Sequence, residues 1–349
     1  MEGREAEVIY VVSILDKFSR RTDATESIDV EQVIESLGEY GRDSKSIDVH
    51  EVIRNLEQGR LSTPSTFVLM SHPNPDIRAF VSDLADVLEL QGHLVLPSSL
   101  YLRAHENKGL QGLIAVTHQL PFVPQTYAFD DSAVALEDLV VVKTGSGSGS
   151  KGVRQFGESR AMRKYLTLES IKRTMLSQVM RLSALFAYRG LFSSIKAMDR
   201  FRSERPWTRF VVQRFVSGQI SDFKVLVFGS RVYVAERKVR ENDFRASGSG
   251  KLSFPTPDDA LLNMAISVRQ LLKVPYVSLD VMLTDYGFQI IEFQTVHFGP
   301  SVKDKAHHAY VPNGQKWEEV ANTTSLEQDI ACALHEFLTD ASQSEQEAI

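Results

Sequence analysis

Apolar residues near the N-terminus recur at the spacing of a helix. Val30, Val33, Ile34 and Leu37 follow this spacing, and it returns in residues 49–56. The segment is acidic and carries no recognisable chemistry. Residues 1–62 are therefore predicted to form a helical N-terminal extension, which ends at a turn-rich stretch at 62–65.

From Phe67 onward the pattern becomes that of alternating strands and helices. Residues 67–71 and 93–97 are short apolar runs, and residues 76–91 have helical spacing followed by Gly92 as a stop signal. A strand–helix–strand unit pairs its strands in parallel through a crossover. With a further helix that ends near Gln119, residues 63–126 are predicted to form one α/β domain.

The second half of the chain alternates between apolar strands and amphipathic helices. Strands are expected at 140–143, 210–216, 222–229 and 231–237, and a long basic helical insertion at 166–202. A helix at 258–272 precedes two strands, 276–283 and 287–293, that form a hairpin around 284–287. We expect a lid subdomain at 127–216, a C-terminal subdomain at 217–340 and a flexible polar tail at 341–349.

Composition narrows the class of protein. The chain has 349 residues, of which 43% are hydrophobic and 24% charged, as in a globular protein of more than one subdomain. No run approaches the roughly 20 apolar residues of a membrane span, and the acidic start lacks the basic region of a secretory signal. The single cysteine, Cys332, excludes an internal disulfide and a Cys-rich zinc site, so a cytoplasmic protein is expected.

The charge is unevenly distributed. Residues 151–214 hold 15 Lys and Arg and four acidic residues, a net charge of +11, which leaves −17 on the rest of a chain of net charge −6. Such a basic segment suggests a bound polyanion, either a nucleotide, a nucleic acid or an acidic peptide. The alternative is a solvated face on an amphipathic helix, and nucleic acid is the least favoured partner.

The hairpin carries a candidate metal site. Side chains alternate between the two faces of a strand, so Asp280 shares a face with Glu292 and Gln294. Two carboxylates and an amide carbonyl are hard oxygen ligands that suit Mg²⁺ together with nucleotide phosphates. The alternative is that these are solvated residues on an exposed strand face.

Two further segments could contact phosphate. Gly-rich backbone at 145–152, directly after a strand, offers unhindered N–H groups, although it could equally be a flexible linker. A basic run contains Arg237, Lys238, Arg240 and Arg245, and guanidinium groups bind phosphate or carboxylate with two donors each. The alternative for this run is a solvated strand end. No motif supports an enzyme nucleophile, and Cys332 lies in an apolar helical stretch typical of a packed thiol.

Taken in order, these pieces resemble the ATP-grasp superfamily, and most closely its branch of ribosomal-protein glutamate ligases and related amino-acid ligases. The resemblance covers residues 66–305. It rests on motifs that follow one another along the chain: Asn107-Lys108, Pro124-Gln125-Thr126, Lys143 with Gly145–Gly152, Gln213–Val216, Gly218 with Asp222 and Lys224, Glu236-Arg237 with Asp243-Phe244-Arg245, and Asp280 with Glu292 and Gln294.

The resemblance implies an α/β ATP-grasp fold and a role for each motif residue. Those implied to bind ATP are Lys108, Lys143, Gly149, Ser150, Gly152, Gln213, Arg214, Phe215, Val216 and Asp222. Arg237 and Arg245 are implied as catalytic residues at the transferred phosphate. Asp280, Glu292 and Gln294 fall at the Mg²⁺ ligand positions, where Gln294 replaces the asparagine usual in the family.

The function that the resemblance implies is an ATP-dependent carboxylate–amine ligase that works through an acyl phosphate, with ATP and Mg²⁺ as cofactors. The alternative is a catalytically weakened ATP-binding module with a regulatory or scaffold role. Expected partners are small-molecule or peptide carboxylate and amine substrates, among them an acidic acceptor, and a second copy of the chain in a homodimer. No membrane partner is expected.

Overall fold

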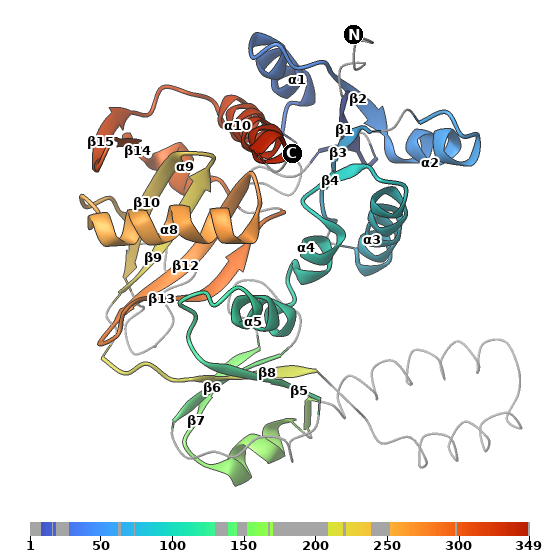
Figure 1. Ribbon diagram of the computed structural model, residues 1–349. Coiled ribbons are helices and arrows are strands. Elements are labelled where there is room, and N and C mark those ends of the chain that lie inside the picture. The colour runs from blue at the N-terminus through green and yellow to red at the C-terminus, as the bar shows by residue number, and fades with distance from the viewer. Residues whose placement is uncertain are drawn as a thin grey trace, which may run out of the picture. The chain divides into compact units, whose positions relative to one another are not determined.

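The computed structural model of the chain divides into two compact units (Figure 1). The larger unit comprises Met1–Asn107, Ile114–Phe122 and Gly218–Ile349, and the smaller unit comprises Lys108–Leu113 and Val123–Ser217. The structure describes residues 8–15, 17–18, 28–61, 64–72, 74–129, 139–144, 152–166, 168–169, 209–218, 221–238, 252–296 and 299–347.

The first sheet of the larger unit has four parallel strands in the order β2-β1-β3-β4. Its strands and the helices that connect and follow them are β1 (Ile9–Ser13), α1 (Val30–Glu39), β2 (Ser44–Asp48), α2 (Val49–Glu57), β3 (Thr66–Val68), α3 (Pro75–Leu90), β4 (Leu94–Leu96) and α4 (Ser99–Ala104). The predicted parallel pairing of the strands on either side of α3 is confirmed.

The prediction of a separate, purely helical N-terminal extension is wrong. Both predicted helices exist as α1 and α2, but β1 and β2 also lie in this segment, and β1 pairs with β3 in the same sheet. The β1 run of Ile9, Val11 and Val12 is buried, as expected for a strand covered on both faces. Strand β2, with the sequence SKSID, is an edge strand in which Ile47 alone is buried, so it has no apolar pattern to reveal it.

Helix α3 shows how local sequence sets the boundaries of an element. Asn74 caps its start by accepting from the backbone N–H groups of Asp76 and Ile77, and Pro75 occupies the first turn, where no N–H is needed. The predicted stop is confirmed, because the helix ends before Gly92, whose φ of +83° favours glycine.

The second sheet of the larger unit has the order β13-β12-β9-β10-β14-β15, with β11 paired to β10, and all its pairs are antiparallel. Its elements are β9 (Ser221–Phe228), β10 (Arg231–Lys238), β11 (Leu252–Ser253), α8 (Asp259–Leu272), β12 (Tyr276–Thr284), β13 (Gly287–Gln294), α9 (Ser301–Lys305), β14 (His308–Asn313), β15 (Lys316–Ala321) and α10 (Leu326–Glu347). The predicted hairpin of β12 and β13 is confirmed.

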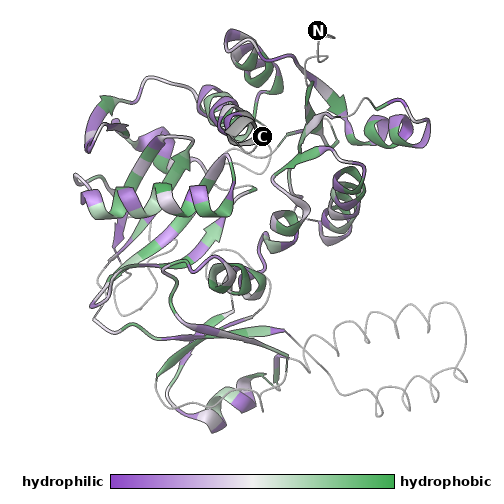
Figure 2. Ribbon diagram, viewed as in Figure 1, coloured by the Kyte–Doolittle hydropathy of each residue, from purple (hydrophilic) through white to green (hydrophobic). Residues whose placement is uncertain are grey.

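Helices α8 and α10 pack on this second sheet, and α10 also contacts α1. Figure 2 shows hydrophilic and hydrophobic bands alternating along α8, and its apolar residues, such as Leu261 and Val268, are buried. One hydrophobic core therefore extends from the first sheet through α10 to the second sheet. The predicted flexible tail from residue 341 is wrong, because α10 continues to Glu347: its polar end contains no Gly or Pro to stop a helix.

The smaller unit contains an antiparallel sheet in the order β5-β8-β6-β7. Its elements are the start of α5 (Lys108–Thr117), β5 (Gln125–Ala128), β6 (Val140–Thr144), β7 (Val153–Phe156) and β8 (Phe210–Arg214). Met162 and Leu166, on a helical turn after β7, complete a core with the sheet. Most of the predicted basic insertion lies outside the described residues.

Among the described residues, no helix has the length and apolar character needed to cross a membrane.

Candidate functional site

Four neighbouring strands of the second sheet place the candidate site residues of the larger unit on one face. Pairing sets Arg237 of β10 opposite Asp222 of β9, Lys224 of β9 opposite Asp280 of β12, and Asp280 opposite Glu292 of β13. Because side chains alternate along each strand, these five charged groups project to the same side. The strand order therefore brings together residues from three sequence motifs.

Arg237 is the centre of this charged cluster. Its Nε and Nη2 donate to the two oxygens of Asp222 at 2.6 and 2.8 Å, and Nη2 also lies 3.1 Å from Asp280 Oδ2. The other Asp280 oxygen accepts from Lys224 Nζ at 2.8 Å. A bidentate pair with a carboxylate fixes the plane of a guanidinium group, so Asp222 orients Arg237. Sequence reasoning assigned Asp222 to ATP and did not predict this role.

Burial and charge act against one another at Asp280. Burial alone would raise the pKa of its carboxyl, but the positive charges of Arg237 and Lys224 outweigh burial and hold that pKa well below its usual range. Burial likewise acts to lower the pKa of Arg237, and the carboxylates of Asp280 and Asp222 reverse the shift. Asp280 is therefore an anion at any physiological pH.

The predicted metal ligands lie together on the hairpin. Asp280 and Glu292 are directly opposite across β12 and β13, and Gln294 Nε2 lies 3.4 Å from Glu292 Oε1. Two carboxylates and an amide are the oxygen donors that Mg²⁺ prefers, so the donor chemistry fits this ion. Within the described ranges, no cluster of three or more His, Cys, Asp or Glu residues could hold a metal ion.

The candidate residues of the smaller unit lie at the start of α5 and on its sheet. Lys108 and Lys143 are both buried, 8% and 7% exposed, on α5 and β6. Gln213 on β8 is also buried, and its amide nitrogen lies 3.4 Å from Gln125 Oε1. Arg214 ends the strand and is exposed.

Two peptide groups at the end of β8 are hydrogen-bonded to residues that directly precede the neighbouring strands β5 and β6. The backbone N–H of Arg214 donates to the carbonyl of Pro124, and that of Phe215 donates to the carbonyl of Leu139. Phe215 and Val216 are half-buried. The segment Gln213–Val216, which is predicted to bind ATP, is therefore held by hydrogen bonds at the end of β8.

Two glycines explain how Lys108 is placed. A Cβ on Gly109 would lie 2.2 Å from the ring of Tyr127, and one on Gly112 would lie 1.9 Å from Gln125 Nε2. The first turn of α5 can pack directly on β5 only because both positions lack a side chain. Gln125 Nε2 also donates to the carbonyl of Lys108 at 2.8 Å.

Three predicted site residues, Gly149, Ser150 and Arg245, lie outside the described residues. Gly152 is described and has a φ of +76° in the turn before β7, a conformation that favours glycine.

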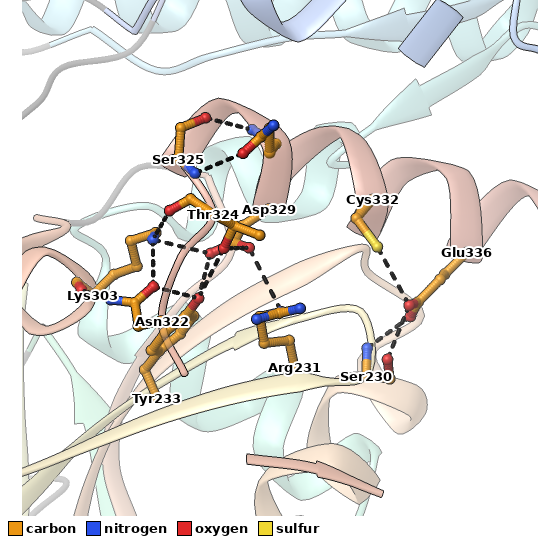
Figure 3. Close-up of polar contacts among 11 residues, drawn as sticks. Ser230, Arg231, Tyr233, Lys303, Asn322, Thr324, Ser325, Asp329, Cys332 and Glu336 are labelled. Carbon is orange, nitrogen blue, oxygen red and sulfur yellow. Dashed lines mark hydrogen bonds and ion pairs between the residues drawn. The ribbon is translucent and has the colours of Figure 1, made fainter. Parts of the chain in front are cut away.

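A buried polar network that was not predicted from the sequence surrounds Tyr233 of β10 (Figure 3). Tyr233 is on the same face of β10 as Arg237, and its hydroxyl donates to Asp329 Oδ2 at 2.7 Å. Lys303 Nζ donates to Asn322 Oδ1 at 2.8 Å and lies 3.6 Å from Asp329. Tyr233 lies 96 positions before Asp329, and no local sequence motif contains these residues.

Three solved structures have a similar arrangement over nearly the whole chain. D-alanine–D-alanine ligase from Bacillus anthracis, complexed with ATP, is 12% identical, and the match covers 96% of this chain and 100% of that chain with a TM-score of 0.50. D-cycloserine synthetase DcsG is 13% identical, with coverages of 95% and 99% and a TM-score of 0.51.

The third structure is the ATP-grasp ligase PsnB, complexed with a minimal precursor, Mg and ADP. It is 14% identical, the match covers 95% of this chain and 98% of that chain, and the TM-score is 0.50. No protein-family model and no curated protein matches the sequence. At these identities the likeness is one of fold, and the roles of individual residues rest on the geometry above.

Proposed function

We propose that this chain, whose fold is the ATP-grasp fold, is an ATP-dependent ligase that joins a carboxylate to an amine. The observation that carries the proposal is the charged cluster, in which Arg237 bridges Asp222 and Asp280 beside Lys224. A nucleotide polyphosphate with its metal ion needs two kinds of group: fixed cations for the phosphate oxygens and carboxylates for the divalent ion. The charged cluster contains both.

The proposed reaction has two steps. A carboxylate oxygen of the first substrate attacks the γ-phosphorus of ATP, the bond from that phosphorus to the bridging oxygen breaks, and ADP leaves an acyl phosphate behind. The amine nitrogen of the second substrate then attacks the acyl carbon and loses a proton, and inorganic phosphate departs as the amide forms. Neither step needs a protein nucleophile, so positioning and charge neutralisation are the work of the side chains.

We assign the side chains as follows. Arg237, oriented by Asp222, neutralises negative charge on the transferred phosphoryl group, and Arg245 is proposed for the same task. Lys108 and Lys143 bind phosphate oxygens, and residues 213–216 bind the adenine, with the backbone of the glycine-rich segment at Gly149, Ser150 and Gly152 over the phosphates. Asp280, Glu292 and Gln294 would hold Mg²⁺, which when bound neutralises phosphate charge and orients the oxygens.

The test is a reaction screen with the purified full chain. The protein is incubated with ATP and Mg²⁺ and with pooled amino acids, peptides and other carboxylates, and ADP, phosphate and new amide masses are measured. The proposal expects ADP and phosphate to rise together with a new condensed product. If bound ATP stays intact with every pool, the chain is instead an ATP-binding regulatory or scaffold module.

The nature of the substrates is a finer proposal. The similar structure of PsnB holds a minimal precursor together with Mg and ADP, and we propose a small-molecule or peptide acceptor for this chain. The +11 charge of residues 151–214 favours an acidic acceptor, because opposite charge raises its local concentration. We further propose that the enzyme works as a homodimer in the cytoplasm.

A further inference from the structure

Both oxygens of Asp280, a proposed metal ligand, already have a cation beside them. Oδ1 accepts a hydrogen bond from Lys224 Nζ at 2.8 Å, and Oδ2 lies 3.1 Å from Arg237 Nη2. The side chains of Lys224 and Asp280 are 17% and 15% exposed, so water and salt screen this pair less than a surface ion pair. The protein therefore supplies its own counter-ions to the carboxylate that the proposed function assigns to a divalent ion.

The two cations are not held equally firmly. Arg237 also donates to both oxygens of Asp222, at 2.6 and 2.8 Å. In the part of the chain that the structure describes, Lys224 Nζ has its one hydrogen bond to Asp280. A lysine has a flexible four-carbon stem, whereas a bidentate pair fixes a guanidinium group. Lys224 is therefore the partner that can leave Asp280, and Arg237 is the one that stays.

A divalent ion and the Lys224 ammonium would compete for the same carboxylate. Because Nζ lies 2.8 Å from Oδ1, a metal ion on Asp280 would lie close to a group of like charge, and the two would repel one another. An ammonium that leaves Asp280 needs another anion. In the proposed ligase the nucleotide supplies it, since lysine binds phosphate as a point charge that needs no fixed orientation.

We infer that Lys224 is an exchangeable counter-ion, which pairs with Asp280 until the metal ion and the nucleotide bind and then turns to a phosphate oxygen. This positioning role rests on the proposed function, which assigns no separate task to Lys224. One substitution should therefore have two effects of opposite sign. Loss of the ammonium should strengthen the binding of the metal alone, because a competitor is gone, and weaken the binding of the nucleotide, because a phosphate partner is gone.

The first measurement is the binding of the metal alone to the full chain. Mn²⁺ suits the same oxygen donors as Mg²⁺, and electron paramagnetic resonance reports its free concentration. Nucleotide, substrates and turnover do not enter this titration. Lys224→Met keeps an unbranched side chain but removes the charge, and it should lower the Kd for Mn²⁺ about tenfold. If Lys224→Met does not fold, the neutral and polar Lys224→Gln decides.

Two controls separate the contact with Asp280 from a general loss of positive charge. Lys316→Met makes the same change at an exposed lysine on β15 of the same sheet, and it should leave the Kd for Mn²⁺ unchanged. Lys224→Arg keeps a cation opposite Asp280 and should not tighten Mn²⁺ binding. In an Asp280→Asn background, Lys224→Met should no longer tighten it either, because the carboxylate for which the ammonium competes is gone.

The second measurement is calorimetry with a non-hydrolysable ATP analogue at saturating Mg²⁺, in which Lys224→Met should raise the Kd about tenfold. Mn²⁺ binding that Lys224→Met weakens or leaves unchanged would overturn the inference, as would a parent protein and variant that bind no Mn²⁺. Unchanged nucleotide binding would also overturn it, because the ammonium would then have no phosphate to neutralise. If both shifts occur but the reaction screen yields no ADP and no amide, the exchange of Lys224 stands and the ligase proposal fails.

Discussion

Two groups of charged residues surround Tyr233 and Arg237, which lie on the same face of strand β10. The two groups differ in burial and in the partners of their charges. Near Tyr233, Lys303 and Asp329 have side chains only 5% and 1% exposed, and the lysine also donates to Asn322 and to a backbone carbonyl. Near Arg237, the side chains of Arg237 and Asp280 are 12% and 15% exposed, and their partners are other side chains. The side chains of the first group are almost completely buried, whereas those of the second group keep a small exposed fraction.

This difference in burial and in hydrogen-bond partners indicates which of the two groups is the better candidate for a functional site. The Lys303 ammonium is buried and donates to a side-chain amide oxygen and a backbone carbonyl. It cannot leave these acceptors without local unfolding, so we expect the Lys303 network to be structural. The ion pairs of the second group join side chains only, so we expect Asp280 to exchange Lys224 for another cation by side-chain rotation. The variants below separate these two behaviours, from the largest expected effect to the smallest.

The largest loss of stability is expected from Lys303→Met. The change removes the ammonium that faces buried Asp329 and leaves that carboxylate with Arg231 at 3.7 Å as its remaining basic partner. Breaking a buried pair in this way costs about 3 to 5 kcal/mol in the free energy of unfolding. Chemical denaturation measures it, and Lys305→Met, at an exposed lysine on the same helix, is the control. Equal stabilities of the two variants would mean that the network is dispensable.

Glu292→Gln should act on activity and not on stability. It keeps the shape of a half-buried side chain but removes one of the two carboxylates proposed for Mg²⁺. We expect the rate of ADP release to fall by about a hundredfold to a thousandfold, because charge stabilisation of the transferred phosphoryl group is lost. The free energy of unfolding should stay within about 0.5 kcal/mol of the parent value. A stable variant with full activity would refute the metal assignment.

The contrast also shows what sequence can and cannot predict. Alternation along two strands was enough to place Asp280, Glu292 and Gln294 on one face, and the hairpin turn was local. The pairing of Lys224 with Asp280 depends on β9 lying between β10 and β12, and no local pattern encodes that order. The Lys303 network joins residues up to 96 positions apart, so it was missed for the same reason. Strand β2 was missed because its edge position removes the apolar signal.

Acid should weaken the ion pairs of Asp280 in a defined direction. The pKa of Asp280 is depressed in the folded protein, so its stabilising contribution is complete above the ordinary carboxyl pKa of about 3.9 and disappears as pH falls below it. At neutral pH, Asp280→Asn should reduce the free energy of unfolding by about 2 to 3 kcal/mol, and the gap should narrow in acid. Denaturation at several pH values tests this, and a gap that widens in acid would contradict it.

Gly109→Ala tests the placement of Lys108. A methyl group there would meet the Tyr127 ring, so α5 must shift on β5 at a cost of about 1 to 3 kcal/mol. Because Lys108 is the first residue of α5, the KM for ATP should rise as well. Gly38→Ala is the matched control, since nothing lies within 4 Å of a Cβ at that helical position. The control should stabilise the protein by about 0.5 to 1 kcal/mol. Similar effects of both changes would argue against close packing of α5.

The smallest effect is expected from Gln294→Asn, at the position where the chain departs from the ATP-grasp pattern. Gln294 Nε2 lies 3.4 Å from Glu292 Oε1, and removal of one methylene withdraws the amide by about one bond length, roughly 1.5 Å. Mg²⁺ demands near-ideal geometry, so the Mg²⁺ concentration that gives half-maximal activity should fall, by less than about tenfold. Gln58→Asn, at an exposed position, is the control. An unchanged Mg²⁺ dependence would show that the amide is no metal ligand.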